Sequence, residues 1–558
     1  MSMKEQSRIV VVGGVAAGAT AATRARRLDE AADIVLVEKG PYVAYANCGL
    51  PYFIGGDIAD RAALFLQAPA WFWARYRVKV LLRTEVVEID RKAKKVRIRG
   101  PEGESYLAYD KLILAQGASP LLPNLPGSDG PGVFRLWTVP DMDRLHEHLR
   151  QQRPKSAVIV GGGFVGLEMA EALRKRGLDT TVVELLPTVL PNMDPEFGRS
   201  VGRELESNGV QVVAGAQVSA FLPSERAVVL SDSRRLPADI VLFSVGARPE
   251  LALARSAGLE VGPSGGLLVD EHLRTSDPDI YAAGDMVEIV HRVSGRKVRI
   301  PLAGPANRQG RIAASNAVGV AMRYPGALGS SVVKIFEATV ALTGLTERAA
   351  REAGLDVGVA VVHKDDRASY YPGAKELSLK LVYRRGDGRL LGAQAFGRAG
   401  VEKRIDVLAT ALAGRMSLAD LAELDLAYAP PYSSANDPIN MAAFVGLNDI
   451  SGASPIATAS ELKAALGSGD ALLVIDLRAS DAYGESHLRG AVNIPVDRLR
   501  SRCEALPRDR PIYVHCRVGW NGHIATRMLR QRGFPKVVNV TGGYLSILAE
   551  EGFDLVSS

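Results

Sequence analysis

Two of the three cysteines in the sequence stand where a thiol could do chemistry. Cys48 lies in the run Asn47 to Tyr52, and Cys516 directly follows the strand-like run Tyr513 to His515, whereas Cys503 lies outside any motif and is expected to be a bystander. No two cysteines are spaced as Cys-x-x-Cys, so neither a zinc site nor a disulfide framework is expected, and no metal site is predicted. A lone thiol such as Cys48 must react through a mixed disulfide, a persulfide or a sulfenic acid.

The elements that must position Cys48 begin with a strand, a glycine turn and a helix. Apolar residues 9–12 run into the glycine-containing turn 13–18, an Ala-rich helix follows, and a second apolar run at 34–37 ends in Glu38. This is the order of a dinucleotide-binding βαβ unit, in which glycines let the backbone approach a pyrophosphate and the acid binds ribose hydroxyls. Val15 occupies the middle glycine position, so an ordinary strand-to-helix turn stays open as the alternative.

The same pattern recurs later in the chain. Residues 157–160 form an apolar run, the turn 161–166 carries all three glycines of Gly-x-Gly-x-x-Gly, and, after a helix, the run 181–183 ends in Glu184. Two such units in one chain predict two nucleotide ligands.

With these units and the stretch Thr275 to Asp285, the chain resembles the FAD- and NAD(P)H-dependent pyridine nucleotide-disulfide oxidoreductases over about residues 8 to 450. The resemblance implies that the first unit holds FAD and the second the nicotinamide nucleotide. Glu184 has no adjacent Arg or Lys to bind a 2′-phosphate, so NADH is expected over NADPH. The residues implied in FAD binding are Gly13, Gly14, Ala16, Ala17, Gly18, Glu38, Lys39, Ala115, Gly117, Asp285 and Ala303. Those implied in NAD binding are Gly161, Gly163, Phe164, Val165, Gly166, Glu168, Glu184 and Gly246.

The surroundings of Cys48 resemble the single-cysteine branch of this family, especially the coenzyme A-disulfide reductases, while NADH oxidases and peroxidases of that branch use the cysteine as a sulfenate. Coenzyme A needs cations for its phosphates, and the first helix ends in a cluster of arginines, which alternatively serve as solvated helix-end charges. The resemblance also implies that tyrosines from the partner subunit approach the cysteine, with Tyr370 and Tyr371 left undecided between them. The arginine cluster consists of Arg24, Arg26 and Arg27, the residues expected to bind coenzyme A are Arg24, Arg27 and Asn47, and the catalytic candidates are Cys48, Cys516, Tyr370, Tyr371 and Tyr428.

The last part of the chain resembles a rhodanese domain, on the run His487 to Pro495 and on the His515-Cys516 pair. In that fold the cysteine lies at the base of a loop leading into a helix, where backbone N–H groups favour a thiolate, so Cys516 is expected to accept sulfane sulfur. Rhodanese loops often end in an Arg that binds thiosulfate, and here that position is Asn521. Arg517 replaces this charge only if its side chain turns inward.

Length and composition agree with a large multidomain α/β protein. The 558 residues are 47% hydrophobic and 23% charged with a formal charge of +6, and neither a basic run nor an apolar membrane span is present in the sequence, so neither nucleic acid nor a membrane is an expected partner. The polar N-terminus predicts no signal peptide and hence a cytoplasmic protein. The predicted domains are an FAD-binding domain (1–150 and 256–328), an NAD(P)H-binding domain (151–255), an α+β dimerisation domain (329–449), a linker (450–464) and a C-terminal rhodanese α/β domain (465–558).

As a whole the chain resembles the coenzyme A-disulfide reductase/rhodanese fusions, which are NADH-dependent persulfide or polysulfide reductases. This resemblance implies a homodimer that uses FAD, NADH (or NADPH) and coenzyme A, in which Cys516 passes sulfane sulfur to Cys48 for reduction to sulfide. Two alternatives stay open. One is coenzyme A-disulfide reduction as the main activity, and the other is a sulfur-delivery protein whose flavin half is a redox switch.

Overall fold

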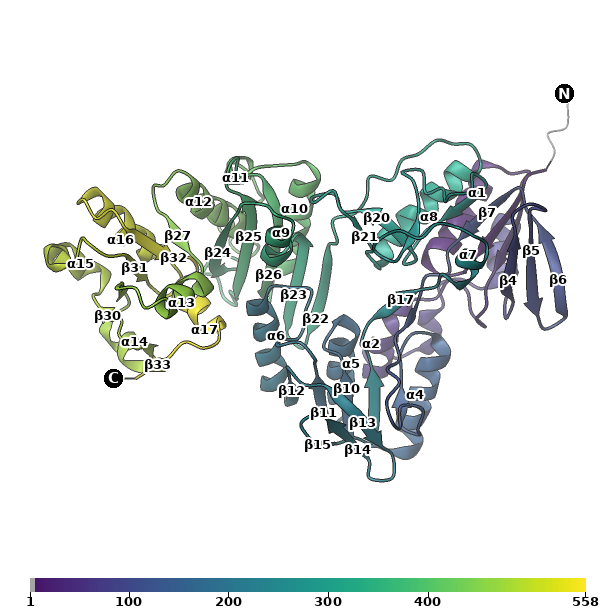
Figure 1. Ribbon diagram of the computed structural model, residues 1–558, viewed down its shortest axis with the longest axis horizontal. Coiled ribbons are helices and arrows are strands. Elements are labelled where there is room, and N and C mark those ends of the chain that lie inside the picture. Colours follow the sequence, from purple (N-terminus) through teal and green to yellow (C-terminus); the bar gives the residue numbers. More distant parts are fainter. Residues whose placement is uncertain (1–5, 558) are drawn as a thin grey trace. The chain divides into compact units, whose positions relative to one another are not determined.

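The computed structural model describes residues 6–557, so the predicted domain ends at residues 1 and 558 lie outside the described residues. The chain forms two compact units. The first comprises the chain up to Leu186 together with Gly209–Gly329, and the second comprises Pro187–Asn208 together with Ser330–Ser558 (Figure 1). The chain therefore leaves the first unit at Leu186, contributes one helix to the second, and returns at Gly209.

The first unit contains two parallel sheets with one shared strand order. The sheets run β19-β7-β1-β2-β3 and β12-β11-β10-β16-β9, and each of the predicted βαβ units supplies two neighbouring central strands. After their first residues these strands are mostly apolar, as expected where helices cover both faces of a sheet. The bounds are β1 Arg8–Val12, β2 Asp33–Val37, β3 Val78–Leu81, β7 Lys111–Leu114 and β19 Ile280–Ala282, and β9 Val133–Phe134, β10 Ser156–Val160, β11 Asp179–Val183, β12 Val210–Val213 and β16 Ile240–Phe243.

A helix follows the glycine turn in each half of the first unit. Helix α1 (Ala16–Leu28) packs against α8 (Ala303–Ala317), and α5 (Phe164–Lys175) is its counterpart in the second half. A Cβ atom on Gly18 would lie 1.7 Å from the Gly13 carbonyl oxygen, and one on Gly166 would lie 2.0 Å from the Gly161 carbonyl oxygen. Glycine is therefore required at both positions for the helix to approach its strand.

The repeat also extends to small antiparallel sheets, one in each half, of order β4-β5-β6 and β13-β14-β15. Strands β8 and β17 pair with each other, so the segments that follow β7 and β16 lie side by side. The bounds are β4 Glu85–Asp90, β5 Lys95–Gly100, β6 Gly103–Ala108, β8 Ala118–Pro120, β13 Val218–Leu222, β14 Ala227–Leu230, β15 Arg235–Pro237 and β17 Ala247–Pro249.

The second unit begins with an antiparallel sheet of order β22-β23-β26-β25-β24. Helix α10 (Val401–Ala413) packs on β23 and β26, while α12 packs on β24 and β25. The other bounds are β22 Ser331–Ile335, β23 Ala338–Gly344, α9 Glu347–Glu352, β24 Val357–Asp365, β25 Glu376–Arg384, β26 Leu390–Gly397, α11 Leu418–Ala422 and α12 Pro438–Ile450.

The C-terminal part of the second unit is a parallel sheet of order β27-β32-β31-β28-β30, with helices between its strands. Segment 450–464, predicted as a linker, contains β27 and the start of α13, where Thr458 and Glu461 form a capping box. Its Gly and Ser content marks a short turn that precedes these elements rather than a long connection. The bounds are β27 Ile456–Ala457, α13 Ala459–Gly467, β28 Leu473–Asp476, α14 Ser480–Glu485, β30 Val492–Asn493, α15 Val496–Arg502, β31 Ile512–His515, α16 Trp520–Gln531, β32 Val537–Val540 and α17 Gly543–Ala549.

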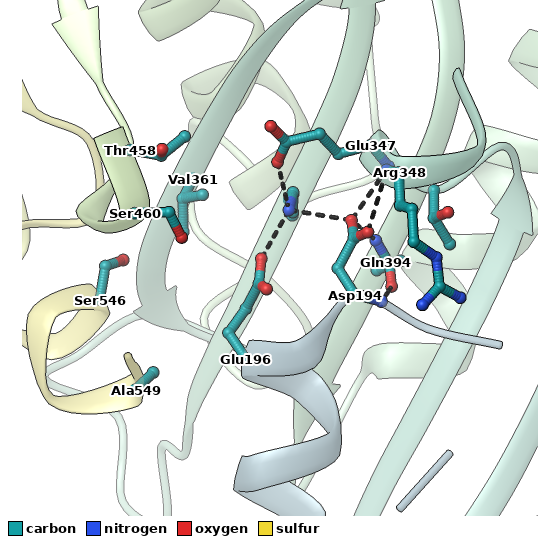
Figure 2. A network of polar contacts seen from close by, with 12 residues as sticks. Asp194, Glu196, Glu347, Arg348, Val361, Gln394, Thr458, Ser460, Ser546 and Ala549 are labelled. Atoms are coloured by element: carbon teal, nitrogen blue, oxygen red, sulfur yellow. Dashed lines mark hydrogen bonds and ion pairs between the residues drawn. The ribbon is translucent and has the colours of Figure 1, made fainter. Parts of the chain in front are cut away.

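A buried lysine joins helix α6 (Pro195–Ser207) to the antiparallel sheet. The Lys380 side chain on β25 is 3% exposed, and its ammonium lies 2.9 Å from Asp194, 2.6 Å from Glu196 and 2.9 Å from Glu347. Figure 2 shows the three carboxylates converging from α6 and α9. Burial by itself raises the pKa values of Asp194 and Glu347, but the Lys380 charge and the hydrogen bonds to each carboxylate lower both below the ordinary value. No helix within residues 6–557 is long and apolar enough to cross a membrane.

Candidate active sites

The Cys48 thiol is carried by a short 3₁₀ turn (Asn47–Gly49) that leads directly into helix α2 (Leu50–Gly55). The cysteine is exposed, and its Sγ lies 3.8 Å from the Asn47 side-chain oxygen, which also accepts a hydrogen bond from the Cys48 backbone N–H. Partial enclosure by the surrounding protein raises the pKa of the thiol, and the nearby carboxylates of Glu168 and Asp285 raise it further. Without another charge beside it, Cys48 therefore favours the neutral thiol.

Glu168 on α5 belongs to the surroundings of Cys48. Its carboxylate accepts a 3.2 Å hydrogen bond from the Tyr52 hydroxyl, four residues after Cys48. Burial raises the pKa of Glu168 to about 7, with a further contribution from Glu171. This carboxyl group can thus hold or release a proton near neutral pH. Glu168 is predicted to bind NAD, and its contact with Tyr52 also connects it to the cysteine turn.

Both predicted nucleotide turns place an acid against the glycine loop. Glu38 accepts hydrogen bonds from the backbone N–H groups of Gly14 (2.7 Å) and Gly40 (2.6 Å). Glu184 accepts the equivalent bonds from Gly162 (2.7 Å) and Leu186 (2.9 Å). The two halves therefore share one arrangement of strand, turn and acid. After Glu184 come Leu185 and Leu186, 62% and 45% exposed, which offer no cation to a 2′-phosphate.

The residues around the first turn fit an FAD molecule. Gly13 has φ +100°, and a Cβ there would lie 2.3 Å from the Ala115 carbonyl oxygen, so the turn brings the ends of β1 and β7 together. Asp285 is half-buried, burial raises its pKa, and no residue within 6–557 donates a hydrogen bond to its carboxylate. An unpaired carboxylate at this strand end can accept a hydrogen bond from a bound group. The other predicted FAD residues lie on the same elements, with Ala16 and Ala17 starting α1, Gly117 after β7, and Ala303 starting α8.

The predicted residues at the rim of these turns differ in their surroundings. Lys39 is bound to Glu85 at 2.7 Å on the surface, so its ammonium already has a partner. In the second half, Gly163 is the N-cap of α5, Phe164 and Val165 form its first turn, and Gly246 follows β16 with φ +101°.

The three arginines at the end of α1 divide into two kinds. Arg26 is buried, and its guanidinium donates hydrogen bonds to backbone carbonyls, among them Tyr76 (2.7 Å) and Ala32 (2.6 Å), so it holds the fold together rather than meeting a ligand. Arg24 lies against Ser315 of α8 (3.1 Å), and enclosure together with the neighbouring Arg311 and Arg27 lowers its pKa. Arg24, Arg27 and Arg311 thus form a group of cations suited to phosphates.

Of the candidate tyrosines of the second unit, Tyr370 and Tyr371 differ in whether they contact Tyr428. The hydroxyls of Tyr370 and Tyr428 lie 3.2 Å apart, and their side chains are 74% and 48% exposed. Tyr371 is 38% exposed, and its described hydrogen bonds are made by its backbone, whose N–H donates to the Ala368 carbonyl and whose carbonyl accepts from the Ala374 N–H. The structure therefore pairs Tyr370, rather than Tyr371, with Tyr428.

Cys516 lies at the C-terminal end of β31, at the start of a loop that ends at α16. It is 4% exposed, and the backbone N–H of Gly519 donates a 3.2 Å hydrogen bond to its Sγ. Gly543 has φ +60°, and a Cβ there would lie 2.4 Å from the Cys516 carbonyl oxygen, so the start of α17 holds the base of the loop. His515 is fully buried, and burial lowers its pKa to about 4, so this histidine is neutral beside the thiol.

The one charged side chain of this loop, Arg517, is paired with a residue from outside it. Asn521 stands in the first turn of α16, and the Arg517 guanidinium lies 2.7 Å from Glu376 at the start of β25. Cys503, in contrast, is fully buried, and its Sγ accepts a hydrogen bond from Arg532 at 2.8 Å.

Arg311, Glu376 and the contact between Tyr52 and Glu168 are not among the features predicted from the sequence. Arg311 shared with Arg24 only its type, because 287 residues separate the two in the chain. Glu376 lies 141 residues before Arg517. Nothing local to either residue marks such a pair, whereas the glycine turns were marked by their own spacing.

Comparisons with known proteins agree with this geometry. The family model described as pyridine nucleotide-disulphide oxidoreductase matches residues 7–310, the dimerisation domain of the same family matches 330–438, and a rhodanese-like domain matches 458–550. An NAD(P)H sulfur oxidoreductase (CoA-dependent) from Pyrococcus abyssi is 36% identical over 439 residues, which are 78% of this chain and 97% of that protein.

Two solved structures match almost the full chain. Reduced Bacillus anthracis CoADR-RHD superposes with a TM-score of 0.95 at 39% identity, covering 98% of each chain. An NAD-dependent persulfide reductase from A. fulgidus gives a TM-score of 0.90 at 38% identity, covering 97% of this chain and 99% of the other.

The chain therefore belongs to the pyridine nucleotide-disulphide oxidoreductase family, and it carries the family's dimerisation domain and a C-terminal rhodanese-like domain. The predicted fold class, with two Rossmann-like units, an α+β domain and a C-terminal α/β domain, is confirmed. It is an oxidoreductase of a family that uses FAD and NAD(P)H.

Proposed function

We propose that the enzyme uses NADH to reduce persulfides, coenzyme A persulfide among them, according to RSSH + NADH + H⁺ → RSH + H₂S + NAD⁺. The observation that carries this proposal is the lone exposed Cys48, set in a unit with two nucleotide turns, in the same chain as Cys516 in its rhodanese-like loop. When bound, FAD supplies the two-electron relay between the nicotinamide and this thiol.

In this proposal Cys48 is the nucleophile. Its thiolate attacks the sulfur bonded to R in the persulfide, the S–S bond breaks, and hydrosulfide leaves with the electron pair and takes up a proton. A mixed disulfide with Cys48 remains, and its two-electron reduction releases RSH. Glu168, with a pKa of about 7, stands near enough to raise the pKa of Cys48, so it can accept the thiol proton as the thiolate forms.

Coenzyme A is the proposed carrier of the substrate sulfur. The cations of Arg24, Arg27 and Arg311 are gathered by the packing of α1 on α8, and Asn47 adjoins Cys48 within the same unit. Guanidinium groups match phosphate oxygens in geometry and charge.

The paired hydroxyls of Tyr370 and Tyr428 are proposed to act at the Cys48 site of the second subunit of a homodimer. Both lie on the dimerisation domain and remain exposed in a single chain. In a homodimer they would donate hydrogen bonds to the sulfur leaving Cys48 of the partner subunit. Cys516 is proposed to accept sulfane sulfur from donors too bulky for the Cys48 site.

The test is the Cys48→Ser variant of the full chain, compared with Cys503→Ser as a matched control. Cys48→Ser should retain FAD, and NADH should still bleach its flavin absorbance, while turnover of coenzyme A persulfide is lost. Cys503 is buried outside both sites, so Cys503→Ser should keep its turnover per flavin. Wild-type turnover in Cys48→Ser would remove this thiol from the mechanism.

The alternative functions are separated by the substrate. NADH oxidation is compared on coenzyme A persulfide and on coenzyme A disulfide at equal concentrations. A higher kcat/KM on the disulfide would make coenzyme A-disulfide reduction the main activity. Slow turnover on every small substrate would favour a redox-switched sulfur-delivery protein.

A further inference from the structure

The cysteine loop of the rhodanese-like domain contains one cationic side chain, and a residue from another domain holds it. Between Cys516 and Asn521 the only charged residue is Arg517. Its guanidinium Nη1 lies 2.7 Å from the Glu376 carboxylate, and the two side chains are 61% and 38% exposed. Glu376 begins β25 of the dimerisation domain, so the partner of this loop charge comes from outside the rhodanese fold.

The two domains are fixed to each other at this point. The Thr541 hydroxyl donates a 3.0 Å hydrogen bond to the Val361 carbonyl, and the Val361 N–H donates a 2.9 Å bond back to it. The His363 ring lies between Ser378 (2.8 Å) and Ser546 (3.1 Å). Glu376 is therefore held in a defined position relative to the loop.

The charge of Arg517 also acts on a titratable group of the dimerisation domain, His363 on β24. Burial lowers the pKa of His363 to about 4, and Arg517 contributes to this shift. The guanidinium is thus directed to β24 and β25, while the thiol of Cys516 receives its described hydrogen bond from the Gly519 backbone N–H.

We propose that Glu376 is a positioning residue that sets the sulfur donor of Cys516: by holding Arg517 on the dimerisation domain, it disfavours dianionic donors such as thiosulfate and leaves persulfides as the preferred class. The proposal rests on the proposed function of Cys516 as a sulfur acceptor. With Arg517 held and Asn521 at the loop end, the loop offers backbone N–H groups but no free side-chain cation for a sulfonate group. The Glu376 carboxylate adds repulsion against a dianion.

The reaction used in the test needs no redox partner. The Cys516 thiolate attacks the outer sulfur of thiosulfate, the S–S bond breaks, and sulfite leaves with the electron pair, which makes Cys516 a persulfide. Cyanide then attacks the terminal sulfur, giving thiocyanate and the original thiolate.

The experiment measures thiocyanate formation from thiosulfate and cyanide by full-length wild-type, Glu376→Gln, Arg517→Gln and the double variant. Exposed ion pairs bias an equilibrium by about twofold to fivefold, so Glu376→Gln should raise kcat/KM for thiosulfate by about that factor. Adding Arg517→Gln should abolish the part of the gain that depends on the released guanidinium. Any gain that remains in the double variant measures the lost repulsion alone.

Two controls make the outcome decisive. Loading of Cys516 by glutathione persulfide, followed by peptide mass analysis, should change less than twofold in Glu376→Gln. Asn521→Arg places at the loop end a cation that is not paired with Glu376. This variant should raise kcat/KM for thiosulfate although the native Glu376 is present.

The proposal is overturned if Glu376→Gln leaves the thiosulfate-to-persulfide ratio unchanged, or if the double variant keeps the whole gain. Failure of the proposed function is a separate result. If Cys516→Ser retains thiosulfate-dependent thiocyanate formation and sulfur loading, Cys516 is not the acceptor, whatever Glu376 does.

Discussion

Replacing Lys380 by methionine should strongly destabilise the second unit. The side chain is 3% exposed, and its ammonium contacts Asp194, Glu196 and Glu347 within 2.9 Å. Removing one partner of a buried ion pair costs about 3–5 kcal/mol, because the remaining charge stays buried without compensation. Asp194 keeps backbone donors at Glu347 and Arg348, and Glu347 keeps Arg351, so we expect the lower end, about 3 kcal/mol.

The pH dependence of this loss has a defined sign. In the wild type the pKa values of Asp194 and Glu347 are lowered, so their stabilising contribution is present above the ordinary carboxylate range and is lost only as the pH falls through their depressed values. The pKa of Lys380 is raised, so its contribution is present throughout neutral pH and is lost only in strong alkali. Without the lysine the buried acids take up protons more readily, and the penalty should shrink between about pH 8 and about pH 5.5.

The assay is the thermal unfolding midpoint and the urea midpoint of wild type and Lys380→Met at both pH values. For a unit of this size, 3 kcal/mol corresponds to a fall of about 6–12 °C in the midpoint of its transition. Lys94→Met is the matched control, since Lys94 also makes a short ion pair, 2.5 Å from Asp279, but is 48% exposed, so its loss should shift the unfolding midpoints little. A loss for Lys380→Met no larger than the control, or one independent of pH, would refute the reasoning.

Three further predictions concern the reaction. Glu184→Ala should lower the preference for NADH over NADPH, measured as the ratio of kcat/KM values, by about tenfold or more. The reason is that a hydrogen bond to a charged group is worth about 1.5–3 kcal/mol, and a wild-type enzyme that is faster with NADPH would contradict the assignment. Glu168→Gln should lower the pKa of Cys48, so the pH midpoint of its alkylation by iodoacetamide should move to lower pH, and an unchanged or higher midpoint would exclude the coupling. Cys516→Ser should impair NADH oxidation with protein-bound persulfides while coenzyme A persulfide is still reduced, and an equal loss on both would make Cys516 obligatory in every cycle or show that the variant is damaged.

Local sequence signals were sufficient for the elements that position both thiols. The two glycine turns, their apolar strands and the terminal acids Glu38 and Glu184 are contiguous motifs, and the structure places each acid against its own loop. These features depend on neighbours within about 25 residues, which a single sequence displays directly.

The remaining features depend on distant parts of the chain or on the face of a helix. Arg26 differs from Arg24 and Arg27 only in the side of α1 on which it lies, and that side is buried with Ala22 and Ala25. The pairing of Tyr370 with Tyr428 spans 58 residues, which left the choice between Tyr370 and Tyr371 open. The capping box at Thr458 was a usable signal that the predicted linker already contains a helix start.

Because residues 187–208 belong to the second unit, a fragment cut at the boundary before residue 330 lacks part of that unit. A fragment that begins after Gly329 would carry the dimerisation and rhodanese-like domains without residues 187–208. Lys380 would keep Glu347 but lose Asp194 and Glu196, and Gln394 would lose its bond to Asp194. During synthesis, likewise, α6 emerges more than 170 residues before the lysine that neutralises it. The second unit is therefore continuous in space but not in sequence, and its halves must be made in one chain or supplied together.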